Sequence, residues 1–125
     1  MSAIHWFEIP VADIDRAIQF YSQVLNAEIP MIDLSEQMGS KLGMLPAHDG
    51  VGGALVENPQ HGYQPSELGT LVYLARGNED LNECLARVES AGGSVVMPKT
   101  DMGEIGFSAW INDTEGNKVG LHSMK

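Results

Sequence analysis

Cysteine, basic side chains and long apolar runs are all scarce in this sequence of 125 residues. Its one cysteine, Cys84, cannot form an internal disulfide, and two-thiol metal motifs are excluded. The chain has seven Lys and Arg residues and 17 Asp and Glu residues, which gives a formal net charge of −10. Such a surface repels phosphate backbones and anionic lipid, so neither nucleic acid nor a membrane surface is an expected partner.

No stretch approaches the roughly 20 consecutive apolar residues that cross a bilayer. The first ten residues lack the basic start and apolar run of a signal peptide, so we expect a cytoplasmic protein. A hydrophobic fraction of 43% is sufficient for the core of a single domain.

The first half of the chain predicts a strand followed by a helix. Aromatic and β-branched residues dominate residues 4–11, which is typical of a strand. Asp13 then precedes apolar residues at helical spacing, and Asp is a favoured N-cap because its carboxylate accepts free backbone N–H groups. Residues 38–46 and 50–57 are candidates for two further strands, joined by a loop around His48.

The second half repeats this plan from Gly69 onward. We expect a strand at 70–75, a helix from 81 to the stop at Gly92-Gly93 with Cys84 on its buried face, and strands at 94–98, 106–113 and 117–123. Trp6 aligns with Thr70 at a spacing of about 64, which indicates a duplicated unit. The single domain, 1–125, then divides into a first module at about 1–58, a linker at about 59–68 and a second module at about 69–125.

Three runs, FEIPVADIDRAIQFYSQVL, CLARVESAGGSVVMPKT and DTEGNKVGLHS, together resemble the vicinal oxygen chelate superfamily. That superfamily contains glyoxalase I, bleomycin-resistance proteins and extradiol dioxygenases. The resemblance implies an α+β fold of two βαβββ modules, each curving its sheet around a cleft, and a homodimer.

The resemblance also implies where a divalent metal would be held, at four strand positions. In this sequence those positions fall on Trp6, on Gly53 or Ala54, on Thr70 and on Gly120, and none of these side chains ligates metal as the superfamily does. We therefore expect no metal cofactor. A slip of the first strand by one residue would instead bring His5 into the cleft beside His122 and allow a metal.

Strand alternation predicts which side chains face the cleft. In the first strand these are Trp6, Glu8 and Pro10, with Phe7, Ile9 and Val11 under the helix. In the second module we expect Thr70, Val72 and Leu74 inward, with Leu71, Tyr73 and Ala75 on the helix side. In the last strand we expect Lys118, Gly120 and His122 inward, with Val119 and Leu121 on the helix side. Trp110 is left open between core packing and a stacking surface.

These patterns favour a protein that binds a small apolar or aromatic molecule in the cleft between the modules, in a resistance-like or carrier-like role. The residues expected to contact that ligand are Trp6, Glu8, Thr70, Val72, Trp110, Gly120 and His122. The alternative is a lyase, isomerase or epimerase related to lactoylglutathione lyase, in which a desolvated Glu8 is the general base, with or without a metal held by His5 and His122. Glu8 can equally be a structural carboxylate. The glycine-containing run around Gly103 and Gly106 is a candidate lid.

Overall fold

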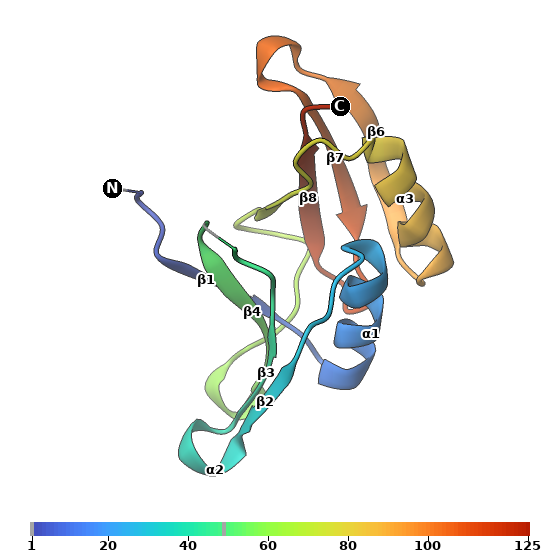
Figure 1. Cartoon of the computed structure of the whole chain (residues 1–125). Helices are drawn as coiled ribbons and strands as arrows, with labels where there is room; N and C mark the ends of the chain where they lie inside the picture. The colour runs from blue at the N-terminus through green and yellow to red at the C-terminus, as the bar shows by residue number, and fades with distance from the viewer. Residues whose placement is uncertain (1, 49) are drawn as a thin grey trace.

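Two four-stranded mixed sheets, each with one main helix on one face, make up the chain (Figure 1). The computed structural model describes residues 2–48 and 50–125, so Asp49 in the loop predicted around His48 lies outside it. The first module comprises β1 (Trp6–Pro10), α1 (Ile14–Val24), β2 (Met31–Leu34), α2 (Ser35–Met38), β3 (Ser40–Met44) and β4 (Gly52–Glu57). A linker with a short 3-10 helix, η1 (Pro59–His61), leads to the second module. That module comprises β5 (Tyr73–Ala75), α3 (Leu81–Ser90), β6 (Ser94–Asp101), the 3-10 helix η2 (Gly103–Ile105), β7 (Phe107–Asn112) and β8 (Lys118–Ser123).

The two sheets have the same topology. Their strand orders are β1-β4-β3-β2 and β5-β8-β7-β6. In each sheet the first strand runs parallel to the last strand of its module, and the other neighbours are antiparallel. This arrangement confirms the α+β class and the two βαβββ modules. The elements β2 and α2 were not predicted, because most of their residues are exposed and carry no apolar periodicity.

The spacing between the modules is 67 residues, and the predicted value of about 64 is wrong. The helix N-caps, Asp13 and Asp80, are 67 positions apart, and so are the first strand residues, Trp6 and Tyr73. The first strand of the second module, β5, begins at Tyr73 and not at residue 70, so residues 70–72 lie outside it. Tyr73, not Thr70, is therefore the counterpart of Trp6.

An error of three positions reverses the predicted faces of β5, because side chains alternate with a period of two. Leu74 is buried in the core with 7% of its surface exposed, whereas Tyr73 is 47% exposed on the opposite face. The inward position predicted for Leu74 and the helix-side position predicted for Tyr73 are both wrong. In β1 the prediction is confirmed, since Ile9 is buried against the helices and Trp6 and Glu8 lie on the other face.

One hydrophobic core spans both modules, because α1 and α3 lie side by side (Figure 1). Cys84 is buried at this junction, as expected, and burial raises the pKa of its thiol. Arg87 donates to the carbonyl of Val24 at the end of α1, at 2.9 and 3.2 Å. Tyr21 of α1 donates a 2.6 Å hydrogen bond to Asp113 of the second module. These contacts fix the two sheets relative to one another.

Candidate functional site

The face of the first sheet that is turned away from the helices is largely apolar; we call it the β1–β4 face. The registers of the three strand pairs place these residues on it: Trp6, Glu8, Pro10, Ile32, Leu34, Ser40, Leu42, Met44, Gly52, Ala54 and Val56. Glu8 is the one charged side chain among these strand residues. Ile32 and Trp6 expose 43% and 40% of their surface, so this face is open in the single chain.

Glu8 is held in place by two aromatic donors. The Tyr63 hydroxyl donates to Glu8 Oε1 at 2.6 Å, and Trp6 Nε1 donates to Oε2 at 3.3 Å. The hydrogen bond to Glu8 raises the pKa of the Tyr63 hydroxyl above its ordinary value. Glu8 is exposed, so the desolvation on which its predicted role as a general base depended is absent from the single chain. That catalytic role stays a prediction.

The corresponding face of the second sheet, the β5–β8 face, is aromatic and basic. The strand registers place these residues on it: Tyr73, Ala75, Ser108, Trp110, Asn112, Lys118, Gly120 and His122. Trp110 Nε1 donates to the Tyr73 hydroxyl at 2.7 Å, and the Lys118 ammonium lies 5.2 Å from the Trp110 ring centroid. Trp110 therefore faces outward with Gly120 and is not a core residue, since its strand neighbours Ala109 and Ile111 are the buried ones.

An aromatic ring lies over a glycine at the equivalent place in each sheet. Trp6 pairs with Gly52 across β1 and β4, and Tyr73 pairs with Gly120 across β5 and β8. A Cβ atom added to Gly52 would lie 3.0 Å from the Trp6 ring, and one added to Gly120 would lie 2.5 Å from the Tyr73 ring. The rings occupy the space that a side chain at either glycine would need.

Trp6 and Gly120 are metal-ligand positions that the sequence resemblance implies, and Tyr73 takes the place of Thr70 because it is the counterpart of Trp6. The remaining implied position is Gly53 or Ala54. The side chains of Trp6, Tyr73 and Gly120, and of either Gly53 or Ala54, do not supply the imidazole and carboxylate donors that a chelated divalent ion requires. In the parts of the chain that the structure describes, 2–48 and 50–125, no three His, Cys, Asp or Glu side chains are placed to hold a metal ion. The residues present do not fit a resident metal.

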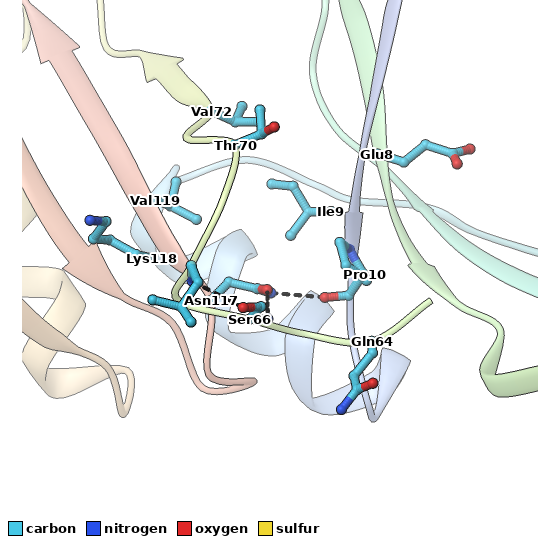
Figure 2. Close-up of a pocket in the computed structure, with 11 residues that line it drawn as sticks. Glu8, Ile9, Pro10, Gln64, Ser66, Thr70, Val72, Asn117, Lys118 and Val119 are labelled. Carbon is cyan, nitrogen blue, oxygen red and sulfur yellow. Dashed lines mark hydrogen bonds between the residues drawn. The ribbon is translucent and has the colours of Figure 1, made fainter. Parts of the chain in front are cut away.

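The two faces point in opposite directions, so the chain does not bring the predicted ligand-binding residues into one cleft. Glu8 extends away from the gap between β1 and β8 on one side, and Lys118 extends away on the other (Figure 2). Ile9 and Val119, which belong to the shared core, point into that gap. The predicted residues that belong to the strands are therefore divided between two surfaces.

A smaller groove does lie between the modules, with a volume of about 240 Å³. Its lining residues are Glu8, Ile9, Pro10, Gln64, Ser66, Leu68, Thr70, Val72, Asn117, Lys118 and Val119 (Figure 2). It includes Glu8, Thr70 and Val72 from the predicted set. Trp6, Trp110, Gly120 and His122 do not line it and belong to the two sheet faces.

His5 and His122, the two histidines predicted as alternative metal ligands, lie in different modules. His5 precedes β1 and is exposed. His122 Nε2 lies 2.5 Å from the carbonyl oxygen of Ile105 and thereby ties η2 to β8. The candidate lid is thus attached to the β5–β8 face by this contact.

Sequence reasoning missed Tyr63 and Tyr73. Tyr63 lies in the linker, where no periodicity indicates its orientation, and it also borders a polar hollow of about 490 Å³ beside α2. Tyr73 was detectable, because it precedes the N-cap Asp80 by the same seven positions that separate Trp6 from Asp13.

With this geometry established, comparison with known proteins identifies the class. The model of the Glyoxalase/Bleomycin resistance protein/Dioxygenase superfamily matches residues 3–121. The chain belongs to this superfamily. No curated protein matches the sequence significantly.

Solved structures of the superfamily share the fold at low sequence identity. A member from Sphaerobacter thermophilus is 21% identical, with a TM-score of 0.69 and 98% of each chain covered. An antibiotic-binding protein from a Streptomyces species is 25% identical, with a TM-score of 0.64, and the match covers 98% of this chain and 96% of that one. A glyoxalase I variant from Zea mays is 16% identical, with a TM-score of 0.72; the match covers 98% of this chain but 45% of the maize chain.

The structure also bears on membrane insertion. Within residues 2–48 and 50–125, no helix combines the length and the apolarity that are needed to span a bilayer.

Proposed function

We propose that this superfamily member binds a small, largely apolar or aromatic organic molecule on its open sheet faces, without a divalent metal, in a resistance-like or carrier-like role. The observation that carries the proposal is that an exposed aromatic ring lies over a glycine in each sheet, Trp6 over Gly52 and Tyr73 over Gly120, where the resemblance implies metal ligands at Trp6 and Gly120. Flat aromatic side chains with exposed surface provide contact area for a planar ligand at a small cost in side-chain entropy. The likeness to an antibiotic-binding protein supports the same role.

The proposal includes a homodimer. The two faces of one chain point apart and leave large apolar side chains exposed, among them Ile32, Trp6 and Tyr73. A second copy would cover this surface and enclose the ligand. Light scattering coupled to size-exclusion chromatography is expected to give the mass of a dimer, and a monomer at micromolar concentration would contradict this part of the proposal.

Two measurements test the binding function. Native mass spectrometry of the purified protein is expected to detect a copurified organic molecule, which Trp6→Ala loses and which the surface control Glu89→Gln retains. Equilibrium dialysis against zinc, nickel, manganese and ferrous ions is expected to show no stoichiometric uptake. Tight uptake of one ion per chain would overturn the proposal.

A further inference from the structure

We infer that the ligand of the β1–β4 face carries a protonated amine, which pairs with the Glu8 carboxylate while the apolar body of the ligand lies along Trp6. The inference rests on the proposed binding function and adds the chemical class of its ligand. It depends on where Glu8 lies, on which groups contact it and on which groups do not.

Glu8 stands alone on an apolar surface. Its neighbours across the strand, Ala54 on β4 and Met44 on β3, are aliphatic, and Trp6 precedes it on the same face. A ligand that covers this surface removes water from the carboxylate. Taking an ionised carboxylate out of water is costly unless a counter-charge or enough hydrogen-bond donors replace the water.

The chain supplies donors to Glu8 but no cation. The described salt bridges join Arg16 to Glu115, both Arg76 and Arg87 to Glu79, and Lys99 to Asp80, so none of them uses Glu8. Lys118 lies over Trp110 and points to the opposite side of the molecule (Figure 2). Within residues 2–48 and 50–125, no Lys or Arg side chain pairs with Glu8.

The two donors orient the carboxylate without neutralising it. Tyr63 occupies one site on Oε1, and Trp6 occupies one site on Oε2. An ionised carboxylate has about four lone-pair sites, so each oxygen can still accept a bond from a ligand.

Charge selects among the ligand classes. A neutral ligand would bury the Glu8 charge without a counter-ion from the same chain, and an anionic ligand would be repelled both by Glu8 and by a chain of net charge −10. A cationic ligand removes both penalties. The acidic excess of the whole molecule also attracts it over longer distances.

The test uses three probes with the same aromatic body: naphthylmethylamine, naphthylmethanol and naphthoate. Calorimetric titration of the full-length wild type at low salt is expected to give at least about tenfold tighter binding of the amine than of the alcohol. Glu8→Gln, an isosteric change at an exposed position, is expected to bind amine and alcohol within about twofold of each other. Glu89→Gln removes the same charge from the exposed side of α3 and is expected to retain the wild-type preference.

Salt provides a second measurement on the wild type itself. The affinity for the amine is expected to fall with added sodium chloride, whereas the affinity for the alcohol stays constant, because only the former depends on an ion pair.

The outcomes separate the two proposals. Equal binding of amine and alcohol by the wild type, or an amine preference that survives in Glu8→Gln, overturns the ligand class but leaves the binding function standing. Binding of none of the three probes contradicts the binding function and the ligand class together.

Discussion

Gly52 and Gly120 determine where the two exposed rings lie, because each leaves room for the aromatic side chain on the neighbouring strand. The spaces differ in tightness. An added Cβ would approach the Tyr73 ring to 2.5 Å at Gly120 but the Trp6 ring only to 3.0 Å at Gly52. Tyr73 is also held by a hydrogen bond from Trp110, so its displacement breaks a second contact.

This difference predicts unequal effects of the same substitution. Gly120→Ala is expected to lower the free energy of unfolding by about 1–3 kcal/mol and to change the near-ultraviolet circular dichroism, because the Tyr73 ring must leave its place. Gly52→Ala is expected to cost less than about 1 kcal/mol, since alanine also favours a strand over glycine. Urea unfolding of both variants measures this, and equal effects would contradict the packing described.

At the scale of elements, α1 joins the two modules because both ends of it contact the second one. At its start, Glu115 from the β7–β8 turn accepts hydrogen bonds from the backbone N–H groups of Ala12 and Asp13 and pairs with Arg16 at 2.7 Å. At its end, Arg76 donates to the carbonyl of Leu25. The helix is thus fixed by groups distant in sequence as well as by its own cap.

The N-cap of α1, Asp13, makes a local contribution to the free energy of unfolding that a single substitution can measure. Asp13 accepts a hydrogen bond from the backbone N–H of Arg16 at 3.1 Å. Asp13→Ala is expected to lower the free energy of unfolding by about 1 kcal/mol, the usual cost of losing an N-cap. The control Asp15→Asn removes a charge from the same turn without a cap bond and should cost no more than about 0.5 kcal/mol. Denaturant unfolding checks both, and an equal loss in the two variants would exclude the cap as the cause.

At the scale of the whole molecule, two carboxylates stabilise the junction of the modules. Burial alone would raise the pKa of Glu115, but hydrogen bonds from Arg16 and from the backbone outweigh it and lower the pKa. The same balance holds for Glu79, where bonds from Arg87 and Arg76 outweigh burial. Because both pKa values are lower in the folded protein, these groups stabilise it above the unfolded value of about 4.5.

The stability of the protein is therefore expected to decrease in acid. The contribution of both groups is complete above pH 4.5 and disappears as the pH falls through their lower folded values. Urea unfolding measured from neutral pH down to about pH 3 should show a lower free energy of unfolding at the acid end in the wild type. Glu115→Gln should flatten the dependence, whereas Glu89→Gln should not, and an unchanged slope in Glu115→Gln would contradict the assignment.

Local patterns in the sequence were sufficient for much of the fold. The N-cap Asp13, the apolar spacing of the two long helices and the alternation along β1 each depend on neighbours within a few residues. Such signals predicted the two modules and the placement of Trp6 and Glu8 on the face of β1 opposite the helices. They failed for β5, where an alignment error of three residues exchanged Leu74 and Tyr73.

The site shows the same division between local and long-range information. The sequence by itself determined that no imidazole or carboxylate stands at the first-strand and last-strand ligand positions, Trp6 and Gly120, since residue type there needs no coordinates. Only the tertiary structure decided that the two sheet faces point apart and that Tyr63 reaches Glu8. The physical reason is that both depend on the packing of α1 against α3 and on the path of the linker, which no local periodicity encodes.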